Sequence, residues 1–244
     1  MFYQPGVTPH NLPHDPFKVY PSRRLNKGNN ANRQACVVPR PIGWISTQNQ
    51  HGQPNLAPYS QFNNLTFDPP YVMFSANQTI ANERKDTVLN AEATGRFVWN
   101  LATYDLREAV NITAEQVPYG EDEFARAGLE KQPASLMDVP MVGESPVKFE
   151  CEYHTTIRLP GNPPMGTVDV VIGKVVGVHV DDAVLTEGKL DVRKTRPIAR
   201  CGYYEYAVVE DTFDMVIPGN SKDTLYGLEG SASQNTEAGR RMRP

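Results

Sequence analysis

Cysteine is scarce in this sequence, with three residues among 244. Cys36, Cys151 and Cys201 are too widely separated for a disulfide framework or a CxxC metal site, which favours buried thiols in a reducing compartment. Long hydrophobic runs are also missing, and the N-terminus has no basic start followed by an apolar segment of signal-peptide length. We therefore expect a cytoplasmic protein without a membrane segment.

Charge of one sign is not concentrated anywhere in the chain. The formal net charge is −4, and charged residues make up 21% of the sequence without forming a run of like charges. A protein that binds nucleic acid or an anionic membrane surface needs a basic patch that neutralises phosphates. The composition thus indicates neither nucleic acid nor membrane as a partner.

Several catalytic motifs are absent as well. No GxGxxG or Walker pattern occurs, which argues against a Rossmann dehydrogenase. The five histidines form no HxH or HExxH pair, which argues against a catalytic metal. No GxSxG motif surrounds Ser46, Ser60 or Ser75, which argues against an α/β-hydrolase.

The most informative stretch present is RPIGWISTQNQHGQPNLAPYSQFNNLTFDPP, residues 40–70. Residues 42–45 are apolar and lead to two hydroxyls, Ser46 and Thr47, which predicts a buried strand with a polar end. Glycine and proline in residues 48–54 predict a reversal of the chain. The returning segment, residues 55–63, mixes small, aromatic and hydrogen-bonding side chains, a composition that suits a binding site better than a core.

A short helix is predicted to begin near Thr87, with Asp86 or Thr87 in the capping position and Gly95 at its end. Lys85 comes directly before this start. A helix N-terminus with free N–H groups, a threonine hydroxyl and a lysine is suited to bind a phosphate. The full set of neutral and cationic candidates for a phosphorylated ligand is Ser46, Thr47, Ser60, Asn63, Lys85 and Thr87.

Short strands dominate the rest of the chain. Residues 147–152 alternate between apolar and charged side chains, and Gly173 and Gly177 within residues 168–180 predict a bulge or bend. Many short strands with two or three helices favour a mainly β barrel over a parallel α/β sheet. The expected strands are 71–75, 97–101, 147–151, 155–159, 168–180 and 201–209, and the expected helices are 87–91, 105–114 and 122–127.

The length suits one β-rich domain with extensions. Residues 1–32 are rich in proline, asparagine and histidine and have no periodic apolar face, so we expect an N-terminal extension there. Residues 33–218 form the predicted domain. Residues 219–244, rich in glycine, serine and asparagine, form a predicted flexible C-terminal tail.

The ordered motifs of residues 39–209 resemble the flavin reductase-like, FMN-binding split-barrel family. The motifs are RPIGWIST at 40–47, NLAPYSQFN at 55–63, DPP at 68–70, KDT at 85–87 and GRFVWN at 95–100. One of these motifs alone would be weak support, but the ordered set is specific. The resemblance implies a mainly β fold, an FMN-binding split β-barrel with a few peripheral helices.

The same resemblance implies where FMN binds. Backbone groups from Ala57 to Ser60 would meet the polar edge of the isoalloxazine ring, and Pro58 and Tyr59 would lend it apolar surface. The Ser46/Thr47 pair and the KDT segment would take the ribityl chain and the phosphate. The residues expected to hold FMN are Ser46, Thr47, Ala57, Pro58, Tyr59, Ser60, Asn63, Lys85, Asp86, Thr87 and His154.

The function implied is NAD(P)H-dependent flavin reduction, with hydride passing from C4 of the nicotinamide to N5 of the flavin. No side chain need act as an acid or base, because the redox chemistry belongs to the cofactor. A homodimer is implied by the family, and reduced flavin would serve a monooxygenase or another acceptor.

One departure from the family pattern keeps two alternatives open. Many short flavin reductases carry Gly-Asp-His in the strand that receives NAD(P)H, whereas this chain has Gly166-Thr167-Val168 at the nearest place. The alternatives are a flavoredoxin-like FMN electron carrier that takes electrons from a protein, and a binding module that has lost redox turnover.

Three further side chains allow two interpretations each. Trp44 either faces the flavin or fills the core. His154 either approaches the cofactor or lies on a strand surface. Arg200 either forms a structural ion pair or contributes to a subunit interface.

Overall fold

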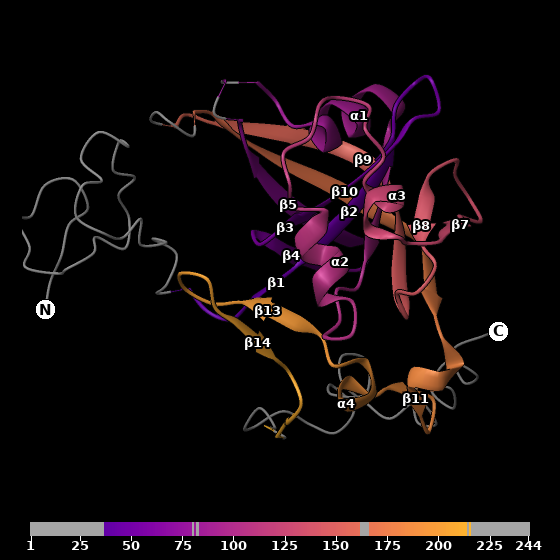
Figure 1. Ribbon diagram of the computed structural model, residues 1–244. Helices are drawn as coiled ribbons and strands as arrows, with labels where there is room; N and C mark the ends of the chain where they lie inside the picture. Colours follow the sequence, from indigo (N-terminus) through magenta and orange to yellow (C-terminus); the bar gives the residue numbers. More distant parts are fainter. Residues whose placement is uncertain (1–36, 80, 82, 162–165, 214, 216–244) are drawn as a thin grey trace, which may run out of the picture.

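The computed structural model describes residues 37–79, 81, 83–161, 166–213 and 215 (Figure 1). The predicted N-terminal extension, the predicted C-terminal tail and Cys36 lie outside these residues. Within the described ranges, no helix is long and apolar enough to cross a membrane.

Seven antiparallel strands form the main sheet, in the order β3-β2-β6-β9-β10-β5-β4. Only Ser60 and Gln61 join β3 to β4, yet these strands lie at opposite ends of that order, so the sheet curls until its ends meet. The strands are β2 (Gly43–Gln48), β3 (Pro54–Tyr59), β4 (Phe62–Phe67), β5 (Pro70–Asn77), β6 (Arg96–Asn100), β9 (Val147–Leu159) and β10 (Val168–Val180). The predicted mainly β barrel is confirmed.

Aromatic and aliphatic side chains fill the interior of the curled sheet. Phe74 and Phe97 are fully buried there, and the ring of Phe62 stacks on Trp99 with 5.3 Å between the centroids. Gly43 leaves room for this stack, because a Cβ at residue 43 would lie 2.7 Å from Cδ2 of Phe62. The glycine of the RPIGW motif is therefore required by close packing and not by a turn.

Two register shifts bend the long β9–β10 pair. They lie between Ile172 and Gly173 and between Val175 and Gly177, which confirms the bulges predicted from the glycines. At Gly173 a Cβ would lie 2.4 Å from the ring of Phe97. The glycine thus allows the ring to pack directly against the backbone of the bulge.

Glu150 departs from the alternation predicted for β9. It is one of the charged residues in the alternating stretch 147–152, yet its side chain is fully buried. Its carboxylate accepts hydrogen bonds from the N–H groups of Ser135, at 2.9 Å, and Leu136, at 2.8 Å, and lies 2.6 Å from Nε2 of His179. The burial of Glu150 therefore depends on partners that are distant in the sequence.

Three helices surround the barrel: α1 (Asp86–Thr94), α2 (Arg107–Ile112) and α3 (Glu123–Ala127). Helix α1 covers one end of the barrel, whereas α2 and α3 pack beside β3 (Figure 1). The predicted cap of α1 was wrong, since Lys85 occupies the N-cap position, while Gly95 ends the helix as predicted. In α2, Val110 is buried, whereas Ile112 is 41% exposed.

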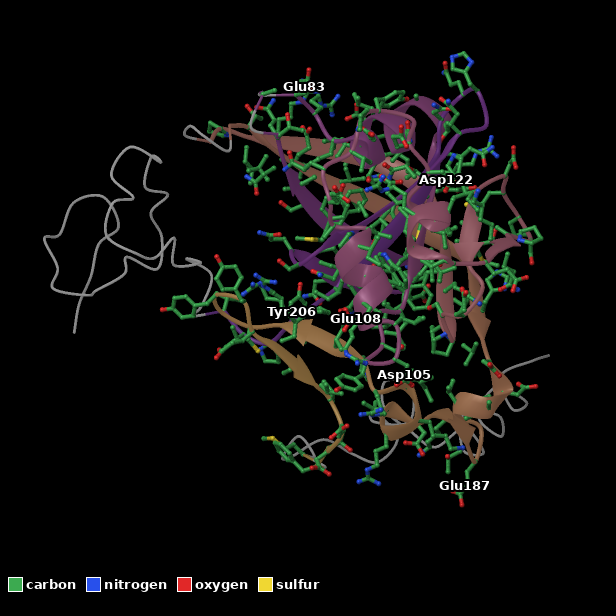
Figure 2. All side chains as sticks on the ribbon, in the orientation of Figure 1. Glu83, Asp105, Glu108, Asp122, Glu187 and Tyr206 are labelled. Carbon is green, nitrogen blue, oxygen red and sulfur yellow. The ribbon has the colours of Figure 1, made fainter. Side chains whose placement is uncertain are left out.

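Shorter elements complete the described chain. Most of them lie at the end away from α1, where Figure 2 shows Glu187 and Tyr206, whereas β7 (Lys131–Pro133) and β8 (Pro140–Val142) lie beside the barrel near α3 (Figure 1). The predicted strand 201–209 is reduced to three residues, because the N–H of Cys201 donates to the carbonyl of Glu205 and closes a turn. These elements are β1 (Arg40–Pro41), β7 (Lys131–Pro133), β8 (Pro140–Val142), a 3₁₀ turn (Asp182–Val184), β11 (Leu185–Thr186), β12 (Lys189–Leu190), α4 (Val192–Thr195), β13 (Ile198–Arg200) and β14 (Tyr206–Val208).

The outer side of β3 offers almost no N–H donors. Pro54 and Pro58 have no N–H, and the N–H of Leu56 donates to Oε2 of Glu123 at 3.0 Å. Because N–H groups alternate in direction along an edge strand, those of the intervening residues face β2. The outer edge of β3 therefore presents carbonyl oxygens only.

Candidate functional site

A buried polar network joins α1 to the strands beneath it. Nδ2 of Asn55 donates to Oγ1 of Thr87 at 2.8 Å, and Nδ2 of Asn90 donates to Oγ1 of Thr47 at 3.2 Å. The hydroxyl of Tyr119 donates to Oδ1 of Asn90 at 3.0 Å. The first four of these side chains are buried, so Thr47 and Thr87 fix α1 on the barrel and thereby orient its N-terminus.

The N-terminus of α1 combines a cation with uncapped backbone N–H groups. Lys85 is half-buried, and its side chain does not cap the helix. Among the described residues, no carboxylate forms an ion pair with Lys85. Burial lowers the pKa of Lys85 and raises the pKa of Asp86, and each charge opposes the shift of the other. A bound anion would stabilise both the lysine and the helix terminus.

Arg84 anchors the helix start to the barrel wall. Its Nη atoms donate to the carboxylate of Glu92 at 2.7 and 2.6 Å, and its Nε donates to Asp169 in β10 at 2.8 Å. Asp169 is buried and also accepts from Nε of Arg158 at 3.1 Å. The hydrogen bonds to Glu92 raise the pKa of Arg84 and lower that of Glu92. Lys85 therefore follows a residue that is fixed on both α1 and β10.

Glu123 is a buried carboxyl group near this helix start. It is the first residue of α3, and it accepts the hydrogen bond from Leu56 described above. Burial raises the pKa of Glu123 to about 6, and the nearby charge of Asp86 adds to the increase. Burial also raises the pKa of the Tyr59 hydroxyl, which hydrogen-bonds with Thr87. Sequence reasoning missed Glu123, because its partner lies in another element.

The segment expected to meet the flavin ring lies at the end of β3. Ala57, Pro58 and Ser60 are half-buried, whereas Tyr59 turns inward and packs on Phe74 with 5.0 Å between ring centroids. The ring of Tyr59 thus belongs to the core and offers little apolar surface to a ligand. The N–H groups of Ala57 and Tyr59 face β2. The backbone groups that face away from β2 are therefore the carbonyl of Pro58 and the N–H and carbonyl of Ser60.

Ser46 lies apart from this network. Strand β2 runs through both hydroxyls and ends one residue later at Gln48, so it has the predicted polar end. Because neighbouring strand residues face opposite sides, Ser46 points away from the face of Thr47 and is fully buried. Its Oγ accepts from Nδ2 of Asn100 at 3.2 Å. The structure does not bring Ser46 together with the α1 N-terminus.

The remaining candidates also lie outside the network. Trp44 is fully buried and donates from Nε1 to Oγ1 of Thr113 at 2.9 Å, which confirms core packing. Asn63 is exposed in β4, and His154 is exposed in β9 with its ring edge against Tyr71, 5.3 Å between centroids. Arg200 lies over the ring of Tyr206, 4.7 Å from its centroid, and it forms no ion pair among the described residues.

These features suit a phosphorylated flavin. The unpaired Lys85 and the uncapped helix terminus suit a phosphate, and the half-buried Ala57–Pro58 surface beside a carbonyl edge suits a flat ring with a polar rim. The carboxyl groups of Asp86 and Glu123 oppose an anion only when ionised, and burial raises the pKa of each. In the described part of the chain, no three His, Cys, Asp or Glu side chains gather as metal ligands.

The strand order and the curled sheet place the fold among the split β-barrels. Residues 35–198 match the family described as "Flavin reductase like domain", and the chain belongs to that family. The match covers the barrel and all the described site residues. The resemblance seen in the ordered motifs is thus confirmed.

Individual relatives agree with this assignment. A protein of Halalkalibacterium halodurans is 32% identical over 207 residues, covering 85% of this chain and 99% of the relative. Nitrilotriacetate monooxygenase component B from Bacillus cereus is 31% identical with a TM-score of 0.70, covering 75% of this chain and 90% of that one. A structure from Shewanella frigidimarina, described as a flavin reductase with a split barrel domain, is 24% identical with a TM-score of 0.67 over 81% and 98% of the chains.

Proposed function

We propose that this protein is an FMN-dependent oxidoreductase, a flavin reductase that uses NAD(P)H. The observation that carries the proposal is the half-buried Lys85, without an ion pair, at the uncapped N-terminus of α1. Bound FMN would supply the redox chemistry, taking hydride at N5 from C4 of the nicotinamide and passing electrons to an acceptor.

The side chains of this protein bind and orient. Lys85 neutralises the phosphate, and the buried network of Thr87 and Asn55 keeps the helix start in place. The Pro58 carbonyl on the edge of β3 is the acceptor available to a ring N–H group. No described side chain needs to donate or take up a proton in this reaction, so the protein contributes position and electrostatics.

Lys85→Met tests the phosphate position. The substitution should weaken FMN binding by about tenfold to a hundredfold, because a charge-assisted hydrogen bond contributes about 1.5–3 kcal/mol. Binding of riboflavin, which lacks the phosphate, should change by no more than about twofold. Quenching of flavin fluorescence measures both affinities on the same protein.

Lys189→Met is the matched control, since Lys189 is exposed in β12. It should leave both affinities unchanged. An equal loss of FMN and riboflavin binding in Lys85→Met would assign Lys85 a structural role, and unchanged FMN affinity would place the phosphate elsewhere. Thr87→Ala is a poorer test, because Thr87 also holds α1 on the barrel.

The electron donor is tested separately from flavin binding. Anaerobic NADH and NADPH are added in turn to the flavin-loaded protein, and bleaching of the flavin absorbance identifies the donor. The departure at Gly166-Thr167-Val168 favours the second candidate, a flavoredoxin-like electron carrier. Flavin that bleaches with a reduced protein donor but with neither nicotinamide would support that carrier.

We also infer a homodimer that delivers reduced flavin to a monooxygenase or another acceptor. Exposed apolar side chains support the dimer: Leu65 and Phe67 lie on the edge strand β4, and Ile157 and Leu159 lie on β9. The component B relative is named as part of a monooxygenase, which supports that acceptor class. The scarcity of cysteine supports a cytoplasmic location.

A further inference from the structure

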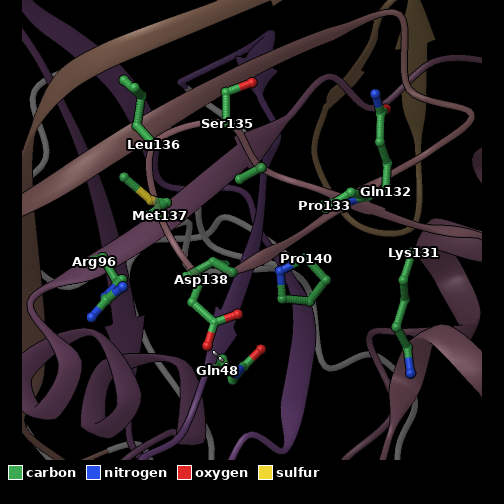
Figure 3. A pocket seen from close by; sticks show the side chains of 12 residues that line it. Gln48, Arg96, Lys131, Gln132, Pro133, Ser135, Leu136, Met137, Asp138 and Pro140 are labelled. Carbon is green, nitrogen blue, oxygen red and sulfur yellow. Dashed lines mark hydrogen bonds between the residues drawn. The ribbon is translucent and has the colours of Figure 1, made fainter.

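A hollow of about 600 Å³ lies outside the barrel, between the β7–β8 loop and strands β2 and β6 (Figure 3). Its floor contains Gln48 of β2 and Arg96 of β6. Ser46 of β2 pairs with Val98 of β6, and Gln48 and Arg96 each lie two residues from this pair, so all four side chains share one face of the sheet. Thr47 and the polar network under α1 lie on the opposite face of β2. The hollow, called the Arg96 hollow below, is therefore separate from the site proposed for FMN.

The wall of the Arg96 hollow is held in place by a buried carboxylate. The carboxylate of Glu150 accepts hydrogen bonds from the N–H groups of Ser135 and Leu136, two residues of this wall. It also forms a hydrogen bond with Nε2 of His179. Burial alone would raise the pKa of Glu150, but these hydrogen bonds stabilise the ionised carboxylate more strongly. The pKa of Glu150 therefore lies below its ordinary value. Glu150 thus stays ionised at neutral pH and keeps the loop closed onto the sheet. The hollow is a built feature of the fold.

Arg96 is the cation of the hollow that has no carboxylate partner. Lys131, at the other side, pairs with Asp122, and Asp138 accepts from Nε2 of Gln48 at 3.2 Å. Nε of Arg96 donates to the carbonyl of Thr94 at 3.3 Å, and no ion pair involves Arg96 among the described residues. The Nη groups of Arg96 are consequently available to an anion.

Apolar side chains line the hollow beside this cation. Leu136 is 64% exposed and Met137 is half-buried, and Figure 3 shows both above Arg96, with Pro140 on the other side of Asp138. An exposed leucine and a half-buried methionine next to an arginine suit a ligand with a charged head and an apolar body. The volume lies within the range of sites for small organic molecules.

We propose that the Arg96 hollow binds a small organic carboxylate. The carboxylate pairs with the guanidinium of Arg96, whose planar donors match a carboxylate in two parallel hydrogen bonds, and the apolar body covers Leu136 and Met137. Asp138 discriminates against a dianion such as inorganic phosphate, because its negative charge lies in the same hollow. A monoanion with an apolar part meets both conditions.

Nuclear magnetic resonance of the full chain, labelled at its methionine methyl groups, tests the location on the wild-type protein. The sequence has seven methionines, and Met137→Leu assigns the Met137 signal. Phenylacetate should shift that signal in a saturable titration, whereas the neutral phenylacetamide and inorganic phosphate should not. A Met137 signal that phenylacetate leaves unmoved, or that phenylacetamide shifts equally, would overturn the proposal.

Substitution of Arg96 tests the head group. Arg96→Gln should weaken phenylacetate binding at least about tenfold, and Arg96→Lys should fall between Gln and the wild type because it keeps the charge without the planar fork. Arg107→Gln, an equal loss of charge at an exposed residue of α2, should leave the affinity unchanged. If Arg96→Gln and Arg96→Lys both bind as tightly as the wild type, the anion does not pair with Arg96.

Discussion

Glu123→Gln should stabilise the protein at neutral pH and leave it unchanged in acid. The folded protein holds the pKa of Glu123 at about 6, against an ordinary value of 4.5, so ionisation at pH 7 disfavours the folded state. A difference of about 1.5 between the folded and unfolded pKa values lowers the free energy of unfolding at pH 7 by about 2 kcal/mol. Stability is lost as the pH rises from about 4.5 to 6, because the folded state binds the proton more tightly over that window.

Glutamine removes the charge but keeps an oxygen that can accept from the N–H of Leu56. For a chain of this size, about 2 kcal/mol raises the melting temperature by roughly 4–8 °C. Circular dichroism melts between pH 4 and pH 8 should show the two proteins converging below pH 4.5 and separating above pH 6. A variant that is less stable than the wild type by the same amount at every pH would refute the reasoning.

Glu123→Leu separates the hydrogen bond from the charge. It leaves the N–H of Leu56 without a partner beside two prolines, and it should lower the stability in acid by about 1–3 kcal/mol relative to Glu123→Gln. Equal stability of the two variants at pH 4 would show that the edge of β3 does not need this acceptor.

Three other substitutions test the packing, the helix anchor and the assembly. Gly43→Ala should lower the free energy of unfolding by about 1–3 kcal/mol in urea titrations, because its Cβ would lie 2.7 Å from Phe62; a smaller loss when Phe62→Leu is added would confirm the clash. Arg84→Met should lower the free energy of unfolding by about 3 kcal/mol and weaken FMN binding, because it leaves the buried Asp169 with one cation fewer; intact FMN affinity would separate this anchor from the site. Phe67→Glu, at a side chain 75% exposed on β4, should convert a dimer into a monomer in light scattering, and an unchanged mass would exclude β4 from the interface.

Local signals predicted much of the fold. Glycine and proline marked the turn after β2, the bends of β10 and the end of α1, because each of these needs a backbone conformation or a close approach that few residues allow. The ordered motifs predicted the family and the barrel. The helix start with Lys85 was also recognisable, since a lysine before a short helix is a local pattern.

The parts that sequence reasoning missed depend on partners far along the chain. The hydroxyls of Ser46 and Thr47 are adjacent, yet strand geometry sends them to opposite faces. Glu150 sits among alternating charges, and only the loop that folds over it explains its burial. Glu123 follows a helix cap without any sign that it serves β3. The roles of the predicted FMN ligands remain predictions.

The spacing of Pro54 and Pro58 restricts how copies of this protein can join. A sheet with two free edge strands, here called its margins, can pair with a strand of another copy at either margin. When both margins pair, copies add repeatedly and form fibres. Here the β3 margin cannot donate a hydrogen bond to an incoming strand, because its only outward N–H, that of Leu56, is taken by Glu123. An incoming strand could use only the carbonyl oxygens of the β3 margin, so the β4 margin is better suited to main-chain pairing between copies. Two such margins satisfy each other, so an assembly of this kind closes at two copies and does not grow.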